Sequence, residues 1–220
     1  MLICPSILSA DFATLAESIK TVTPQTDWLH VDVMDGHFVP NLTIGAPVVK
    51  SLRKHTELFM DCHLMITNPA KYLPDFAKAG ADSCSIHVEL GNTADLIKQA
   101  RDLGIGVGLV ANPDTPFEDF ASFLGGVDVM LLMTVFPGFG GQKFIETVLP
   151  KITETAREIQ LLDASTIIQV DGGIDVINGP KAAKAGARAF VAGNAIFAQA
   201  DPLQAATDLR ASIDAAIGAS

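Results

Sequence analysis

Eight short apolar segments recur along the chain, and each is followed by a stretch with the mixed apolar and polar spacing of an amphipathic helix. The apolar segments are continuous runs rather than alternating ones, which is typical of parallel strands with helices packed on the sheet. We therefore predict parallel β-strands at 2–8, 28–34, 58–65, 83–88, 106–110, 127–133, 166–170 and 189–192.

The intervening segments predict helices. Several end in Ala-Gly-Ala, where glycine suits the left-handed cap of a helix. The predicted helices lie at 11–22, 46–54, from about 68 onward, at 93–103, 116–124, 143–161 and 175–185, followed by a closing pair that ends near Ile217.

Strict βα alternation with about 27 residues per unit predicts a single (β/α)8 TIM barrel spanning residues 1–220. The alternative is an open doubly wound sheet. That fold would carry a Gly-x-Gly-x-x-Gly turn after the first strand to bind a nucleotide, and this sequence does not have one.

Composition narrows the class of protein. The chain is 49% hydrophobic and 18% charged, so a sizeable core is expected, and no apolar run approaches the roughly 20 residues of a membrane span. The net charge of −10 argues against nucleic acid or an anionic membrane as a partner. Cys4, Cys62 and Cys84 lie in apolar strand segments, which indicates buried thiols in a cytoplasmic protein, and the start of the chain has no basic signal-peptide region.

Charged and imidazole side chains stand at the ends of three predicted strands. His30 and Asp32 share one face of the second strand, His63 lies near the end of the third and Asp171 directly follows the seventh. Each alone is best explained by a local hydrogen bond, but in a barrel all four would meet at the mouth where active sites lie. Two imidazoles and two carboxylates suit one divalent cation such as Zn, Fe, Mn or Co.

Two further polar residues share those inward faces. Asp61 lies on the face of His63, and we expect it to orient that imidazole by a hydrogen bond. Gln169 lies on the face of Asp171 and is expected to play the same part there. His37, His55 and His87 show no partner pattern and are interpreted as surface or structural residues.

Glycine-rich loops follow the sixth, seventh and eighth strands. One glycine pair would be an ordinary turn, but three adjacent loops in a barrel favour a grip for a phosphate by backbone N–H groups. The residues of these loops are Gly138, Phe139, Gly140, Gly141, Gly172, Gly173, Gly193 and Asn194.

Three methionines, Met34, Met65 and Met133, also end strands. Each is either a core residue or part of an apolar lining around a reacting substrate. Ser6, near the end of the first strand, is placed to hydrogen-bond a substrate hydroxyl or its own backbone. No lysine stands at a strand end, which disfavours Schiff-base chemistry.

Several stretches together resemble the ribulose-phosphate 3-epimerase family, along nearly the whole chain. They are Pro-Ser-Ile-Leu-Ser-Ala-Asp-Phe at 5–12, His-Val-Asp-Val-Met-Asp-Gly-His-Phe-Val-Pro-Asn at 30–41, Asp-Cys-His-Leu-Met at 61–65, Pro-Gly-Phe-Gly-Gly-Gln at 137–142, Val-Asp-Gly-Gly at 170–173 and Ala-Gly-Asn-Ala-Ile-Phe at 192–197. The family has a (β/α)8 barrel of the ribulose-phosphate-binding type. It interconverts D-ribulose 5-phosphate and D-xylulose 5-phosphate in the pentose phosphate pathway with a bound divalent metal.

The resemblance implies roles for particular residues. It makes Asp32 and Asp171 the acid–base pair, and Ser6 and His63 contacts of the sugar. The metal ligands that it implies are His30, Asp32, His63 and Asp171, and the three glycine loops would hold the phosphate. It also implies a cytoplasmic homo-oligomer that acts on a small sugar phosphate and spans no membrane.

Some residues depart from the family pattern, and some alternatives stay open. Phe136 stands where the family has a polar residue, Thr134 where serine is common and Gln169 where glutamate is common. An epimerase for a related ketose phosphate, such as allulose 6-phosphate, fits the same residues. A hexulose-phosphate synthase-like lyase ranks lower, because that class carries Asp-x-Lys where this chain has Asp61-Cys62-His63. A sugar-phosphate binder without activity would not need two opposed carboxylates.

Overall fold

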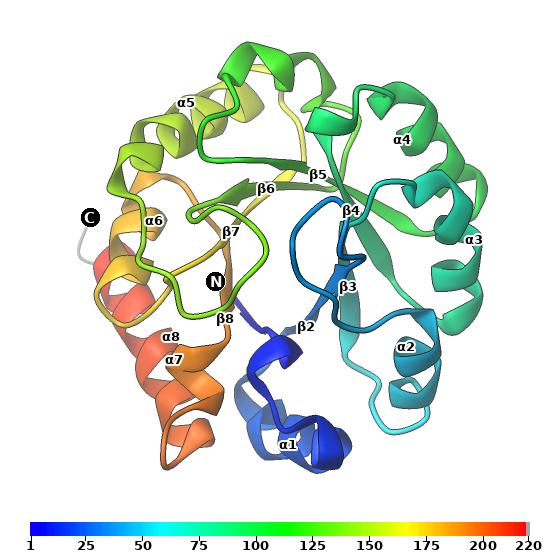
Figure 1. Ribbon diagram of the computed structural model, residues 1–220. Coiled ribbons are helices and arrows are strands. Elements are labelled where there is room, and N and C mark those ends of the chain that lie inside the picture. The colour runs from blue at the N-terminus through cyan, green and yellow to red at the C-terminus, as the bar shows by residue number, and fades with distance from the viewer. Residues whose placement is uncertain (219–220) are drawn as a thin grey trace.

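Eight parallel strands form a ring at the centre of the molecule, as the computed structural model of residues 1–218 shows (Figure 1). The strands pair in the order β1-β8-β7-β6-β5-β4-β3-β2, and a parallel bridge between Ser6 and His30 joins the two ends. The (β/α)8 prediction is confirmed. The strands are β1 Leu2–Pro5, β2 Trp28–Met34, β3 Phe59–Met65, β4 Ser83–His87, β5 Gly106–Ala111, β6 Val129–Met133, β7 Ile167–Asp171 and β8 Ala189–Ala192.

Helices lie outside the ring of strands, where they cover its outer face (Figure 1). They are α1 Leu15–Val22, α2 Ala46–Leu52, α3 Pro69–Ala79, α4 Thr93–Asp102, α5 Leu149–Leu161, α6 Asn178–Ala185, α7 Asn194–Phe197 and α8 Pro202–Gly218. Within residues 1–218, none of the helices has the length and the apolar character that crossing a bilayer requires.

The predicted helix at 116–124 is wrong. This segment forms two short 3-10 helices, η5 Phe117–Asp119 and η6 Ala121–Phe123, because Phe120 between them leaves the helical region with φ −127° and ψ −11°. The pair Gly125-Gly126 follows directly and disfavours further helix.

Other predicted elements exist but begin or end elsewhere. The first strand stops at Pro5 rather than at residue 8, because the Ser6 hydroxyl accepts a hydrogen bond from the Leu8 N–H and starts the 3-10 helix η1 Ile7–Ser9. The helices predicted from 11, 143 and 175 begin as α1, α5 and α6 only at 15, 149 and 178. Short 3-10 helices, η2 Phe12–Thr14 and η7 Glu146–Val148, precede α1 and α5; η3 Thr23–Gln25 and η4 Val88–Leu90 follow α1 and β4.

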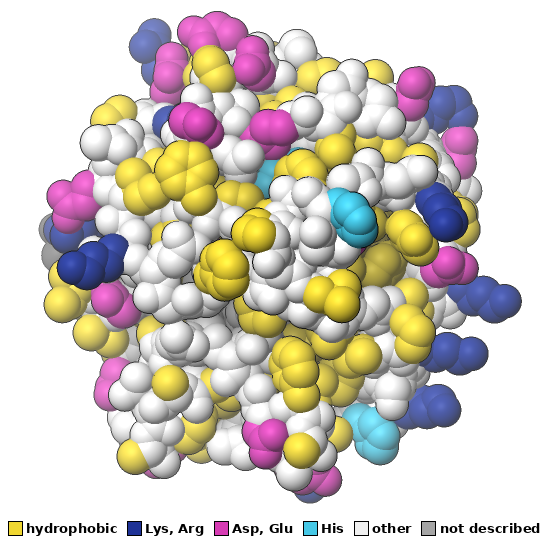
Figure 2. Space-filling view, in the orientation of Figure 1, with side chains coloured by type: hydrophobic (Ala, Val, Ile, Leu, Met, Phe, Trp, Pro, Cys, Tyr) yellow, Lys and Arg dark blue, Asp and Glu magenta, His cyan; other side chains and the backbone are white. Residues whose placement is uncertain are grey.

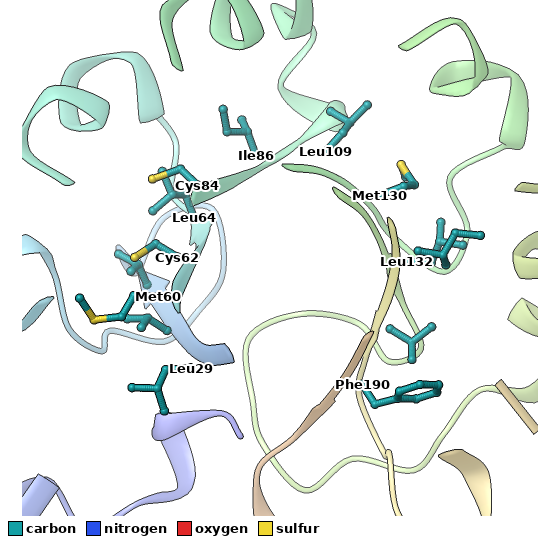
Figure 3. Packing of buried hydrophobic residues seen from close by; sticks show 14 of the residues in the cluster. Leu29, Met60, Cys62, Leu64, Cys84, Ile86, Leu109, Met130, Leu132 and Phe190 are labelled. Atoms are coloured by element: carbon teal, nitrogen blue, oxygen red, sulfur yellow. The ribbon is translucent and has the colours of Figure 1, made fainter. Parts of the chain in front are cut away.

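Alternate residues of each strand face opposite sides of the barrel wall. Outward side chains form the large apolar core between strands and helices, and in Figure 3 the labelled ones, among them Leu29, Cys62 and Phe190, lie around the outside of the strands. His30 and Asp32 on β2 face inward, as the alternation predicted. The three cysteines are buried free thiols, also as predicted.

Candidate active site

Four side chains from three strands converge inside the barrel. His30 and Asp32 come from β2, His63 from β3 and Asp171 from the last position of β7. One potential ligand atom from each lies within 4.8 Å of all the others. The structure therefore brings together the four residues that the strand ends singled out, although the chain separates the first and last by more than half its length.

The nitrogen and oxygen atoms of this cluster face one another as cation ligands do. His30 Nε2 lies 3.4 Å from Asp32 Oδ1 and 3.9 Å from Asp171 Oδ2, and His63 Nδ1 lies 3.3 Å and 3.8 Å from the same two oxygens. His30 Nε2 is buried without a hydrogen-bond partner among the residues described. A buried polar atom of this kind costs free energy unless it is satisfied, so the donor set fits a divalent cation.

Behind His30 stands Asp61, which is fully buried. Asp61 Oδ2 lies 3.1 Å from His30 Nδ1, and its Oδ1 accepts hydrogen bonds from the hydroxyls of Ser83 and Ser85 at 2.7 and 3.1 Å. The prediction that Asp61 orients His63 is wrong. The strand register places Asp61 opposite His30, and it is this imidazole that Asp61 holds.

The end of β7 is held by Thr134 and not, as predicted, by Gln169. Gln169 is fully buried, its amide lies beside Cys4 and Asp61, and within the described residues it has no hydrogen bond to Asp171. The expectation that it orients Asp171 is therefore wrong. Thr134 instead fixes the backbone there, because its hydroxyl donates to the carbonyl oxygens of Asp171 and Gly172.

The two carboxylates of the cluster have opposite electrostatic environments. Burial opposes the charge of Asp32, but the adjacent His30 and His63 outweigh it and lower the pKa of Asp32 well below its usual value. Burial and, next, the negative charge of Asp32 raise the pKa of Asp171 to about 7. At neutral pH Asp32 is a carboxylate, whereas Asp171 exchanges a proton readily. Pairs of acids separated in this way are typical of sites that move protons.

The two imidazoles of the cluster also differ in the direction of their pKa shifts. Burial alone would lower the pKa of His30, but the charges of Asp32 and Asp61 raise it well above its usual value. For His63 burial dominates and lowers the pKa to about 4, despite its contact with Asp32. His63 is therefore neutral at physiological pH, as a ligand of a cation must be.

His87 is the residue that the sequence analysis missed. It is fully buried at the end of β4, and its Nε2 lies 2.9 Å from His63 Nε2, so of the two interpretations given for His87, surface or structural, the structure excludes the first. His37 and His55, by contrast, are exposed. The sequence does contain a pattern that could have identified His87 as an inward residue. Ser83, Ser85 and His87 occupy every second position of β4, and all three point inward.

A cavity of about 780 Å³ opens above the cluster. Asp32 and Asp171 form part of its floor, whereas His30 and His63 lie beneath them and are fully buried. Every other predicted binding or lining residue borders this cavity. These are Ser6, Met34, Met65, Met133, Gly138, Phe139, Gly140, Gly141, Gly172, Gly173, Gly193 and Asn194.

The glycine loop after β7 needs its glycines for two reasons. Gly172 and Gly173 have φ of +117° and +65°, in the region that side chains disfavour. Each also packs closely, Gly172 against Val135 and Gly173 against the backbone of Phe144. The loop therefore presents backbone without side chains to the cavity. Lys143, which also borders the cavity, contributes a positive charge.

The long loops after β2 and β6 meet over the ring of strands (Figure 1), and the loop after β6 borders the cavity. The Asn41 amide donates to the Gly138 carbonyl oxygen at 2.9 Å, and the Gln142 amide donates to the carbonyl oxygens of Phe136 and Phe139 at 2.6 and 3.0 Å. The Phe136 and Phe139 rings are exposed. On the face shown in Figure 2, apolar side chains gather near the middle and the Lys and Arg side chains lie toward the periphery.

Comparison with known proteins extends the resemblance. The model of the ribulose-phosphate 3 epimerase family matches residues 2–197. The cytoplasmic isoform of ribulose-phosphate 3-epimerase from Oryza sativa subsp. japonica is 45% identical over 218 residues, which is 96% of this chain and 94% of that protein. Ribulose-phosphate 3-epimerase from Bacillus subtilis (strain 168) is 47% identical over 216 residues, with 96% and 98% covered.

A solved structure shares the fold alone. Orotidine 5'-phosphate decarboxylase from Pyrococcus horikoshii OT3 superimposes with a TM-score of 0.73 at 17% identity, covering 97% of this chain and 99% of that one. At that identity the likeness concerns the barrel and not the chemistry. The sequence matches, however, run through all three strands that carry the histidine and aspartate cluster, and the chain belongs to the ribulose-phosphate 3-epimerase family.

Proposed function

We propose that this protein interconverts D-ribulose 5-phosphate and D-xylulose 5-phosphate by inverting C3, with one divalent cation held by His30, Asp32, His63 and Asp171. The observation that carries this proposal is the pair of aspartates. Asp32 and Asp171 both reach the cavity floor, they belong to a cation-ligand cluster, and their pKa values are shifted in opposite directions.

Inversion at a carbon next to a ketone requires removal of its proton and return of a proton to the opposite face. β2 and β7 are separated by β1 and β8 on one side of the ring and by four strands on the other, so their aspartates approach the cavity from two sides. Asp32, a carboxylate, takes the proton from one epimer, while Asp171 in its protonated form supplies one to the other face. In the reverse direction the two residues exchange roles.

A bound cation would act as a Lewis acid that stabilises the negative charge on the substrate oxygens of the ene-diolate. The protein contributes the surroundings. Met34, Met65 and Met133 are buried apolar residues on the cavity wall, and they exclude water that would protonate the intermediate at random. The Ser6 hydroxyl donates to Asp32 Oδ2, so it orients the base and lies beside the sugar.

The phosphate of the substrate would bind the glycine loops after β6, β7 and β8. Their residues border the same cavity as the two aspartates. Binding energy at this remote group positions C3 between the two aspartates. The free sugar ribulose should therefore lose much of kcat/KM relative to its 5-phosphate.

Purified protein tests the proposal by turnover on three substrates before and after chelation. We expect efficient epimerisation of ribulose 5-phosphate, a weaker reaction with allulose 6-phosphate and no lyase reaction with hexulose 6-phosphate. Activity should disappear with the cation and return when one equivalent of Zn²⁺ or Mn²⁺ per chain is added. Full activity in protein verified to be metal-free would contradict the proposed need for a cation. Faster turnover of a hexulose phosphate would contradict the proposed substrate.

A further inference from the structure

A chain of hydrogen-bonding groups runs from His63 away from the cavity. His63 Nδ1 faces Asp32 and Asp171, while its other ring nitrogen lies 2.9 Å from His87 Nε2. On the far side of His87, Nδ1 lies 2.9 Å from Glu89 Oε2. Both imidazoles are fully buried, so water cannot replace these partners.

The position of Glu89 is fixed by the loop after β5. Its Oε1 accepts hydrogen bonds from the Asn112 N–H at 2.8 Å and from the Thr115 hydroxyl. Burial disfavours the charge of Glu89, but these bonds and the contact with His87 lower its pKa to about 2, so it is an anion. Lys151 on α5 holds the same loop by donating to the carbonyl oxygens of Asn112, Pro113 and Thr115.

These contacts determine where the protons lie. A carboxylate only accepts hydrogen bonds, so His87 must donate its Nδ1–H to Glu89. A neutral His87 then has a lone pair on Nε2 and accepts the Nε2–H of His63. His63 is left with its lone pair on Nδ1, the nitrogen that faces the two aspartates.

We propose that Glu89 and His87 are positioning residues that fix the Nε2–H tautomer of His63 and thereby present Nδ1 to the cation. The inference deepens the proposed function and rests on its cation site. His87 makes no contact with the cavity, so it acts through His63 rather than on the substrate.

The other imidazole has the opposite arrangement. Asp61 lies directly against His30 Nδ1, which leaves Nε2 of His30 toward the cluster. The proposal therefore makes a specific statement about the pair: His30 binds through Nε2 with Nδ1 protonated, and His63 binds through Nδ1 with Nε2 protonated. A carboxylate orients each ring, directly in one case and through a second imidazole in the other.

Nitrogen-15 NMR of the intact protein loaded with Zn²⁺ reads these tautomers directly. The His63 ring should show a proton on Nε2 and a metal-shifted Nδ1, and the His87 ring should show a proton on Nδ1 alone. A metal-shifted Nε2 on His63, or a proton on both nitrogens of His87, would overturn the inference. Failure of the parent protein to bind Zn²⁺ at all would instead overturn the cation site itself, so the two failures are distinguishable.

Variants give a second measurement by competition for Zn²⁺ with a chelator. Glu89→Gln keeps the shape but can no longer impose one tautomer, so Zn²⁺ affinity should fall roughly 10- to 100-fold. Glu118→Gln, the same change at an exposed position, is the matched control and should leave affinity unchanged. His87→Gln, whose amide oxygen can accept from His63, should retain more affinity than His87→Phe. Equal affinities for Glu89→Gln and Glu118→Gln, with melting curves like that of the parent, would contradict the proposal.

Discussion

The inside of the barrel has two unlike sides. On β2, β3 and β4 the inward positions in the middle of the barrel are polar, and they hold His30, Asp32, Asp61, Ser83 and the residues around them in a fully or nearly buried network. On β6 and β8 the inward positions are apolar. The inward apolar residues there are Val129, Leu131 and Met133 on β6, with Ala189 and Val191 on β8.

The apolar and the polar side of the barrel therefore contribute differently to stability and to function. Buried polar groups are tolerated where a neighbouring strand supplies the partner, as Asp61 does for His30 and both serines do for Asp61. Among the buried polar atoms that lack a hydrogen-bond partner in the described residues is His30 Nε2, which faces the proposed cation. We infer that the apolar side supports the fold, while the polar side keeps its partly satisfied groups for a ligand.

The largest expected effect lies on the apolar side. Leu131 is fully buried among Val110, Val129 and Met133, so Leu131→Ala should lower the free energy of unfolding by about 2–5 kcal/mol through lost burial and the cavity left behind. Denaturant unfolding measures the loss. Affinity for Zn²⁺ should stay within about twofold of the parent, and a large loss of affinity would show that the two sides are not separable.

On the polar side, a substitution should change the affinity for the cation more than it changes stability. Asp61→Asn removes the charge behind His30 without changing its size, so Zn²⁺ affinity should fall roughly 10- to 100-fold. Competition with a chelator gives the affinity, and Asp95→Asn, at an exposed position, is the matched control. If affinity is unchanged while stability falls by several kcal/mol, Asp61 belongs to the structural side of the comparison.

A smaller effect concerns the protonation of residues in the cluster and its dependence on pH. Burial and Asp32 raise the pKa of Asp171 to about 7, so folded protein without a cation binds more protons than unfolded protein between the ordinary pKa of Asp and about pH 7. The stability contributed by Asp171 is therefore present at low pH and lost as pH rises through about 7. The raised pKa of His30 means that its ring must lose the Nε2 proton before it can bind a cation, so loading at pH 7 should release on the order of one proton per chain.

Calorimetry in buffers with different ionisation enthalpies counts the protons released. The release from His30 should persist at pH 7, where a histidine of ordinary pKa is already mostly neutral. A pH dependence of cation-free stability that Asp171→Asn leaves unchanged would contradict the environment assigned to Asp171, and loading that releases no proton at pH 7 would contradict the one assigned to His30.

Much of the barrel follows from the sequence because continuous apolar segments and strand alternation are local signals. The inward direction of His30, Asp32 and His63 needs nothing more than the two-residue repeat. The partner of Asp61 needs the strand register, which is set by the whole sheet. Along β3 the next inward residue, His63, lies about 6.6 Å away, whereas the neighbouring strand passes at about 4.8 Å, so Asp61 pairs with His30.

His87 was missed for a related reason. Its partners Glu89 and His63 belong to a turn after its own strand and to the neighbouring strand, and neither spacing forms a recognisable motif. The residues 116–124 have a helix-like composition but are confined between the loop that holds Glu89 and the Gly125-Gly126 turn, so they form 3-10 turns instead.

The most direct test of the two-sided acid–base mechanism is deuterium exchange by the two aspartate variants in heavy water, once each is shown to retain its cation. With Asp171→Asn, Asp32 can still remove the C3 proton from one epimer but inversion is blocked, so deuterium should enter that epimer faster than it is converted. Asp32→Asn should show the same behaviour with the other epimer. Both variants exchanging the same epimer, or either one epimerising at the parent rate, would contradict the assignment of Asp32 and Asp171 to opposite faces.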